Sequence, residues 1–498
     1  MSIRHDQQRR SVTWDVSAGP RNYLQLVGTQ LLSSLASLLT VWILTRVLGA
    51  AGYGRVAALI AAAMLIGMVA LNWSAMALAR IGCEEFVETG RITDTFWTRT
   101  GILLLNWLLV LVTAPLWFRA LASWLQLNNE MQFWLLVYLA SLSAWAHVQY
   151  ALQAAKLQGL VGRLLALERL LILSGAILLA LNGASLTKIV AAYASGALAA
   201  AVGGLWRLRH LIGRVRGLNP ALAGRVLLFS LPLIPQSLIS YFSTNYLDAW
   251  FILHYRSSAD LGVYSLAYQL AGTAMQLPVL ASSLLLPMFT TLEVKQDDQR
   301  LAVYAHDILP VLSLGWAAAG TFITGALVVF LPLVFGAQFA QAAPLIWPLM
   351  AACVIVGPMS MGYGPLLNAK SATTAIAVSA LAGAGANVLL NFALIPRWGM
   401  LGCAWATVGA YLINLLVGAY LLWRVSGLSG GWVLEAILPP ICGAAFAGAT
   451  GNNWLAFLLT LAIIFCLALA HRATLLSGGR RLYGIWARKY ELALLPES

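Results

Sequence analysis

Long apolar stretches recur along almost the whole chain and are separated by short polar connections. Each is roughly 20 residues long, the length that a helix needs to cross a hydrocarbon core about 30 Å thick. The pattern predicts an all-α polytopic membrane protein with about 14 transmembrane helices. The predicted spans lie near residues 22–44, 55–79, 100–118, 132–152, 164–182, 187–206, 225–245, 261–288, 306–332, 343–366, 373–394, 400–423, 432–450 and 453–470.

Composition supports this class, because 61% of the 498 residues are hydrophobic and only 9% are charged. The polar segments between the spans are too short to hold a soluble domain. Residues 1–21 are polar and basic, and the apolar run after them is longer than the roughly 7–15 residues of a secretory signal core. We therefore interpret that run as a retained first span.

Positive charge follows the alternation of sides that this topology creates. With the N-terminus in the cytoplasm, 23 of the 30 Lys and Arg residues fall in cytoplasmic segments, six fall on the other side, and Arg169 lies inside a span. This bias is typical of the positive-inside rule and predicts that both termini are cytoplasmic. Because topology accounts for the net charge of +13, we expect no nucleic-acid partner.

The longest basic connection, residues 207–224, divides the chain into two six-span halves. We expect an N-terminal bundle over 22–206 and a C-terminal bundle over 225–423. Two further spans occupy 432–470. Residues 471–498 form a basic tail, in which Leu, Ile and Trp are spaced to share one face of an amphipathic helix lying on the cytoplasmic leaflet.

A weak internal repeat supports this division. An Arg just past the span, a Gly/Tyr turn and a helix rich in small residues follow the first span at Arg46–Gly54 and the seventh at Arg256–Tyr264. Six spans separate the copies, so both enter the membrane with the same polarity. In transporters such a parallel repeat relates two bundles with the substrate path between them.

Motifs for chemical catalysis are missing from the sequence. The five cysteines are scattered, without a CxxC or Cys/His cluster, so we expect no metal site. The sequence contains no GxxxxGK[ST] phosphate-binding loop and no GxSxG or HExxH motif. We therefore expect no enzyme activity, no catalytic residues and no cofactor beyond a coupling ion.

Four stretches resemble polysaccharide flippases (Wzx-like) of the multidrug/oligosaccharidyl-lipid/polysaccharide exporter superfamily. They are Thr45-Arg-Val-Leu-Gly-Ala-Ala-Gly-Tyr-Gly54, Ser230-Leu-Pro-Leu-Ile-Pro235 with Asp248, Gly262-Val-Tyr-Ser-Leu-Ala-Tyr268, and Asn387 through Ile395-Pro-Arg-Trp-Gly399 to Thr407. They occur in the family's order over roughly residues 20–425. One departure is that Ala50-Ala51 replaces the usual proline–acid pair.

The resemblance implies a flippase in the bacterial cell inner membrane that serves lipopolysaccharide or exopolysaccharide biosynthesis. Its substrate would be an undecaprenyl-diphosphate-linked oligosaccharide, carried from the cytoplasmic to the periplasmic leaflet by alternating access. Membrane lipids, a polysaccharide polymerase and chain-length proteins are the implied partners. The last two spans would lie outside the core and hold the lipid tail.

Two other functions stay open. A multidrug exporter of the same superfamily moves organic cations and would need acidic groups deep in the bundle, where this chain has few. A membrane-bound polymerase or ligase of lipid-linked sugars would typically carry a large periplasmic loop, and every periplasmic gap here is short.

Cationic residues along the path are candidates to bind the diphosphate. Arg46 and Arg256 occupy equivalent points of the repeat at the periplasmic mouth, with contact to lipid headgroups as the competing role. Arg80 and Arg225 lie at cytoplasmic span ends, where ordinary positive-inside charge competes. Arg169 follows Glu168 near the predicted cytoplasmic end of span five, where a local ion pair or snorkelling is the favoured interpretation.

Polar groups within the spans provide two further hypotheses. Asp248 would bind a coupling ion, H⁺ or Na⁺, unless it caps a helix or pairs with an arginine. A polar lumen for sugar hydroxyls would be lined by His147, Gln149, Gln153, Asn72 and Asn106. Joining one helix to another is the competing role for these five.

Overall fold

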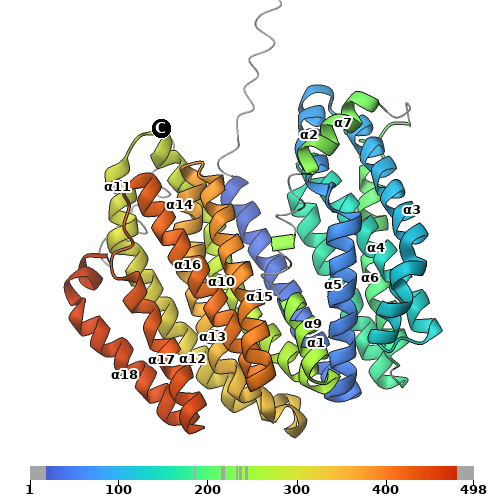
Figure 1. Cartoon of the computed structure of the whole chain (residues 1–498). Helices are drawn as coiled ribbons and strands as arrows, with labels where there is room; N and C mark the ends of the chain where they lie inside the picture. Colours follow the sequence, from blue (N-terminus) through green and yellow to red (C-terminus); the bar gives the residue numbers. More distant parts are fainter. Residues whose placement is uncertain are drawn as a thin grey trace, which may run out of the picture.

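The computed structural model describes residues 18–183, 185–214, 219–231, 234, 238–239, 241 and 245–478. These residues form helices and connections without any strand (Figure 1). The helices are α1 Ala18–Ile66, α2 Ala75–Thr89, α3 Thr93–Trp124, α4 Asn129–Ala154, α5 Gln158–Leu181, α6 Leu186–Leu208, α7 Pro220–Ser230, α9 Asn245–Tyr255, α10 Ser258–Val294, α11 Asp298–Val303, α12 Leu309–Phe335, α13 Ala343–Pro358, α14 Gly364–Ala369, α15 Thr373–Trp398, α16 Met400–Ser426, α17 Val433–Thr450 and α18 Asn453–Ala470.

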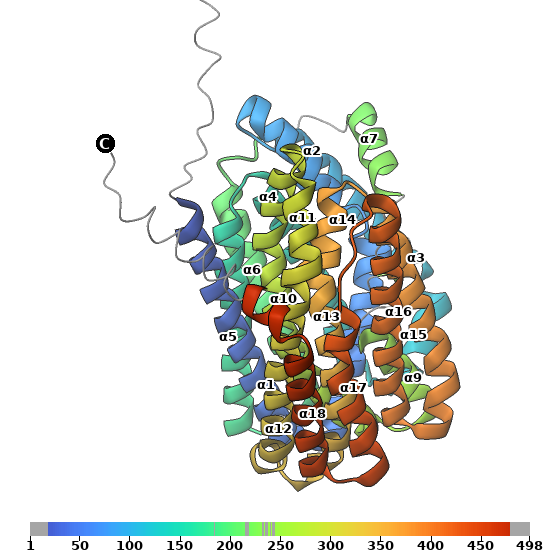
Figure 2. The same cartoon turned by 90° about the vertical axis from the view of Figure 1, so that its left-hand side faces the viewer.

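Two bundles make up the molecule, as the repeat predicts. Helices α2 to α6 form the first bundle and α9 to α16 the second, with α1 packed against α5 of one and α10 of the other. Helices α17 and α18 lie on the outside of the second bundle against α12, which Figures 1 and 2 show from two directions. The fold is that of an all-α membrane protein with two additional C-terminal helices.

The predicted count of 14 spans is approximate. Twelve helices among the described residues are long and apolar enough to cross a membrane. The first two predicted spans are both in α1, where the helix is broken by a kink at Gly49, whose φ is 67°. The seventh, predicted over 225–245, lies partly outside the described residues, and its two ends are helical as α7 and α9. Helix α7 packs on α2 and α3 of the first bundle.

Helical hydrogen bonding is interrupted between α1 and α2. A π-helical turn at Gly67–Leu71 is followed by a non-helical step at Asn72. Side chains of α3 bond to this break: Asn106 donates to the Leu71 carbonyl at 3.4 Å, and Arg99 donates to Asn72 Oδ1 at 3.0 Å. In lipid a broken helix needs such partners for its free polar groups.

At one end of the molecule, which we call the closed end, the two copies of the repeat touch. The backbone of Gly54 faces that of Ser258, and Gly262 faces Ala50, so closely that a Cβ on either glycine would overlap the opposing carbonyl oxygen. Glycine is required here because only its backbone permits this approach. Figure 1 shows the bundles meeting at this end, low in the view, and separating toward the other.

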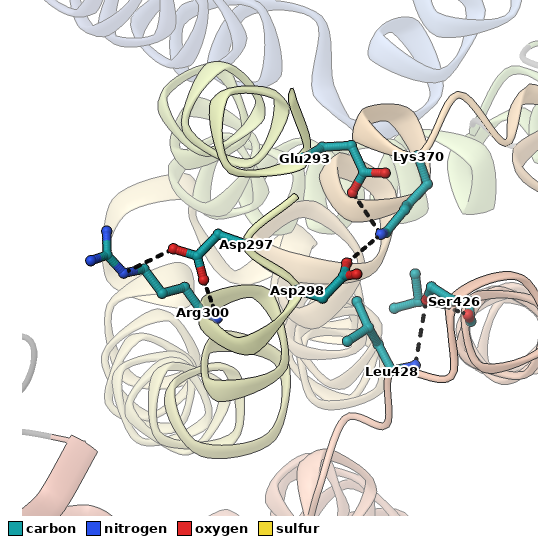
Figure 3. Close-up of polar contacts among 8 residues, drawn as sticks. Glu293, Asp297, Asp298, Arg300, Lys370, Ser426 and Leu428 are labelled. Carbon is teal, nitrogen blue, oxygen red and sulfur yellow. Dashed lines mark hydrogen bonds and ion pairs between the residues drawn. The ribbon is translucent and has the colours of Figure 1, made fainter. Parts of the chain in front are cut away.

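The opposite end, which we call the basic end, carries the connections near Arg91, Arg207 and Lys370. In Figure 3, Lys370 reaches from the end of α14 to two carboxylates, with Nζ 2.6 Å from Glu293 Oε2 and 2.8 Å from Asp298 Oδ1. Hydrogen bonding to Asp298 and Glu293 raises the pKa of the Lys370 ammonium, against a lowering effect of burial that is the largest single contribution. The lysine therefore stays charged and holds α10, α11 and α14 together.

Several predicted segments lie outside the described residues. These are residues 1–17 of the basic N-terminal segment, residues 215–218 of the linker 207–224, and the tail from residue 479 on, including the stretch expected to be amphipathic.

Candidate functional site

A polar cavity of about 540 Å³ lies between the two bundles. Its walls come from α1, α4, α5 and α6 on one side and α9 and α10 on the other. Most lining side chains are hydroxyls, amides and aromatic rings: Gln30, Ser33, Ser34, Ser37, Thr40, Tyr53, Tyr138, Trp145, Gln149, Tyr193, Tyr246, Ser265, Tyr268, Gln269, Thr273 and Gln276. Such a surface suits a hydrated polar group rather than a lipid chain.

Two helices supply most of this polarity through regularly spaced residues. Gln30, Ser33 and Ser37 on α1, with intervals of three and four, fall on one face of an otherwise apolar helix. Ser265, Gln269 and Gln276 repeat the arrangement on α10. Both polar faces line the cavity, one from each half of the chain.

Charge enters the cavity through one pair of residues on α5. Glu168 and Arg169 both line it, and they lie at the middle of the helix Gln158–Leu181. The prediction that they lie near the end of span five was wrong, because the helix begins six residues before the predicted span. At 1.5 Å per residue, Arg169 lies about 16 Å along the helix from the first residue of α5.

The surroundings of Arg169 leave its guanidinium available to a ligand. Tyr138, Tyr193 and Tyr246 interact with it electrostatically from three different helices, as does neighbouring Glu168. Among the described residues it makes no hydrogen bond and no ion pair within 4.0 Å. A half-buried cation whose guanidinium makes no ion pair within 4.0 Å among the described residues can bind an anionic group.

Comparison with known proteins places the chain in a family. The sequence model of the family described as polysaccharide biosynthesis protein matches residues 20–293, more than half of the chain. The chain belongs to the polysaccharide biosynthesis protein family. No curated protein sequence matches it.

Solved structures show which transporters share the fold of this polysaccharide biosynthesis protein. The lipid II flippase MurJ in its inward closed conformation superposes with a TM-score of 0.68 over 90% of this chain and 99% of that chain, at 14% identity. An inward-facing multidrug resistance MATE family transporter of the MOP superfamily gives 0.55 over 81% and 98%, at 12% identity. The Vibrio cholerae MATE transporter VcmN gives 0.50 over 82% and 97%, at 14% identity. The fold is therefore that of this transporter superfamily.

The four arginines predicted to bind substrate lie away from the cavity. At the closed end, Arg46 donates from Nη2 and Nε to the Val334 carbonyl oxygen at 2.7 and 3.2 Å, which ties α1 to the end of α12. Arg256 lies 3.5 Å from each of the carbonyl oxygens of Ile395 and Pro396 near the end of α15. Both guanidinium groups thus lie where the helix dipole favours a cation.

Arg80 and Arg225, the other two, share Glu84 on the exterior of the basic end. Arg225 on α7 contacts the Glu84 carboxylate directly, and Arg80 lies 4.0 Å from it. All three side chains are well exposed. Their role as substrate ligands stays a prediction.

Asp248 lies in a separate cluster of polar side chains inside the second bundle. Its carboxylate accepts from the Tyr264 hydroxyl at 2.6 Å and from Asn391 Nδ2 at 2.9 Å, and it is only 1% exposed. A cavity of about 10 Å³ adjoins it, lined also by Asn387, Thr407 and Asn414. The Oδ1 atoms of Asn391 and Asn414 are buried without a hydrogen-bond partner. Neither of the alternatives, an arginine partner or a simple cap, accounts for this arrangement.

Of the five residues predicted to line the lumen, Gln149 faces the central cavity. His147 instead pairs with Thr100 at 3.0 Å inside the first bundle. Asn72 and Asn106 bond to the helix break described above, and Gln153 is half-buried outside the cavity. The stripes on α1 and α10 went unpredicted, although their intervals of three and four were a readable signal.

Proposed function

We propose that this protein is a flippase that carries an undecaprenyl-diphosphate-linked oligosaccharide across the bacterial inner membrane by alternating access. Family membership supports a role in polysaccharide biosynthesis, and the shared fold supports transport between two bundles. The basic end would face the cytoplasm together with both termini, in line with the positive-inside rule. A polysaccharide polymerase and chain-length proteins would act on the product.

The observation that carries this proposal is the position of Arg169. It is the cationic residue among the described residues of the cavity lining, it lies at the middle of α5, and hydroxyl and amide groups line the same cavity. A diphosphate needs a charged donor to leave water, and a sugar chain needs many neutral donors and acceptors. The lining offers both.

Replacing the charge of Arg169 tests this role. In liposomes that contain the full chain and a fluorescent undecaprenyl-diphosphate trisaccharide, Arg169→Ala should slow flipping roughly 10- to 100-fold, the value of a charge-assisted hydrogen bond. Arg169→Lys should recover part of the rate. Arg163→Ala is the matched control, since Arg163 is exposed on the same helix. A wild-type rate in Arg169→Ala would exclude this site.

Asp248 is proposed to bind the coupling ion, Na⁺ or H⁺. A carboxylate sealed in a bundle is costly unless a cation or proton neutralises it. The adjoining space has about the volume of one water, and the unpartnered amide oxygens are ligands that a hard cation accepts.

Applying a Na⁺ gradient and a pH gradient in separate experiments shows which of the two ions drives flipping. We expect flipping by the wild type to respond to a Na⁺ gradient or to a pH gradient, and Asp248→Asn to remove that response. Asp94→Asn, which alters an exposed carboxylate at the start of α3, should keep it. A rate that ignores both gradients in the wild type would refute ion coupling.

One observation favours the alternative function, export of organic cations. Glu168 lines the cavity, and a buried acid is what a cation exporter needs. Arg169 beside it offsets this attraction, which is why we prefer the flippase. Efflux of a fluorescent cationic dye from cells that express the protein, abolished in Glu168→Gln, would support the exporter instead.

A further inference from the structure

The cavity has an unusually even balance of charge for the site of an anionic substrate. Among the described residues that line it, only Glu168 and Arg169 carry a formal charge at neutral pH. When both are charged, these lining residues have no net charge. A diphosphate that binds Arg169 engages the one positive charge among them.

Glu168 and Arg169 are neighbours on α5 and both interact electrostatically with Tyr138 and Tyr193. Successive residues of an α-helix point about 100° apart. Arg169 also interacts with Tyr246 of α9, and Glu168 with Trp145 of α4. Gln149 lies one turn further along α4 and also lines the cavity. The Glu168 wall therefore combines a carboxylate, an aromatic ring and an amide.

Such a wall suits an uncharged sugar. Hydroxyl groups donate hydrogen bonds to a carboxylate, and an acetamido group donates its N–H in the same way. A uronic or sialic acid would instead place a second carboxylate near Glu168, while Arg169 is already engaged by the diphosphate. Like charges repel strongly where little water screens them, and no lysine or other arginine is among the described residues that line this space.

We infer that the cavity selects oligosaccharides with uncharged sugars and rejects acidic ones, and that Glu168 determines this specificity. This inference rests on the proposed flippase function and adds the class of sugar. Glu168 acts chiefly by disfavouring the wrong substrate, since a neutral glutamine would bind neutral sugars nearly as well.

Two substrates that differ only at C6 of one sugar, which is an alcohol in one and a carboxylic acid in the other, test the inference. The full chain in liposomes receives fluorescent undecaprenyl-diphosphate trisaccharides that carry either glucose or glucuronic acid at the terminal position. The wild type should flip the neutral lipid at least about tenfold faster, as expected for a repulsion of this kind. Glu168→Gln should bring the ratio close to one by raising the rate of the acidic lipid.

Controls separate charge from folding and from the function itself. Glu168→Asp keeps the carboxylate and should keep the preference, and Glu130→Gln makes the same change at an exposed position of α4. Equal rates of both lipids in the wild type, or an unchanged ratio in a Glu168→Gln protein that still flips the neutral lipid, would overturn the inference. If the wild type moves neither lipid, the flippase function itself fails.

Discussion

Contacts at the two ends of the molecule are of different kinds. At the closed end they cross between the bundles: Arg46 bonds to Val334, and Gly54 meets Ser258. At the basic end the ion pairs stay local, with Arg225 joined to Glu84 on the first bundle and Lys370 to Glu293 within the second. Contacts at the closed end thus hold the two bundles together, whereas the ion pairs at the basic end stabilise each bundle internally.

This difference shows how the fold can work as a two-state device. In such a device each bundle moves as a rigid body. Contacts within a bundle must therefore persist through the cycle, whereas contacts between the bundles must break. The crossing contacts must also be few, because a ligand can shift the equilibrium only by its differential affinity for the two states. Changes at the closed end should therefore alter the cycle, whereas changes at the basic end should alter stability.

The largest effect is expected from the glycines of the closed end. Gly54→Ala or Gly262→Ala would force the two repeats apart, because the added Cβ overlaps a backbone oxygen. Overpacking of this kind costs about 1–3 kcal/mol, enough to lower the closed population about tenfold. Flipping should fall accordingly, and a thiol introduced by Ser37→Cys in a cysteine-free protein should become reactive from the closed-end side.

Gly315→Ala is the control for these variants, since nothing lies within 4 Å of a Cβ at that position of α12. Normal flipping and an unreactive thiol in Gly54→Ala would show that the repeats do not have to touch.

A smaller effect at the same end is expected from Arg46→Ala. The variant loses the charge-assisted bonds to the Val334 carbonyl, but Trp42, which donates to the same oxygen at 2.9 Å, and Gln338 remain. Because the guanidinium is exposed, we expect the closed state to lose about 1 kcal/mol of stability. The reactivity of the thiol in the assay above should then rise roughly fivefold. Arg55→Ala, which removes an exposed arginine nearby, should have no effect. Equal behaviour of the two variants would deny Arg46 a role in holding the bundles together.

The smallest effect is expected from loss of the ion pairs of Lys370, a change that should leave the transport cycle intact. Lys370→Met removes the link between Glu293 and Asp298 and should lower the unfolding free energy in detergent by about 1 kcal/mol at pH 7. The raised pKa of Lys370 means that this contribution is complete below the ordinary lysine value, about 10.4, and disappears as pH rises through the folded value.

Denaturation curves from pH 7 to strongly alkaline pH measure that difference. Lys295→Met, an exposed lysine at the same end, is the control. If the unfolding free energies of Lys370→Met and wild type differ by the same amount at high pH, the ion pair is not the source of the difference.

Hydropathy alone predicted most of the fold because lipid imposes a simple length rule on each span. It also placed the boundary between the first two spans near Gly49, where α1 kinks. It did not predict that α7 packs on the first bundle although it follows the linker. That outcome depends on contacts between segments far apart in the sequence.

The candidate site was less predictable for a related reason. Arginines at span ends are conspicuous in the sequence, yet Arg46 and Arg256 bond to helix carbonyls, and the cavity charge belongs to the Glu168–Arg169 pair. A polar residue in a span gives the same signal whether it faces a cavity, as Gln149 does, or joins two helices, as Asn106 does.

The sequence by itself determined that the chain is helical, lies in a membrane and repeats, since apolar length, charge bias and the Arg–Gly–Tyr motif are local properties of the chain. Only the tertiary structure decided which polar groups share the space between the bundles, because the facing of a helix depends on the rotation at which its neighbours pack. That rotation turns Ser37 and Arg169 into the cavity between the bundles, and it turns Asp248 into a separate, smaller cavity.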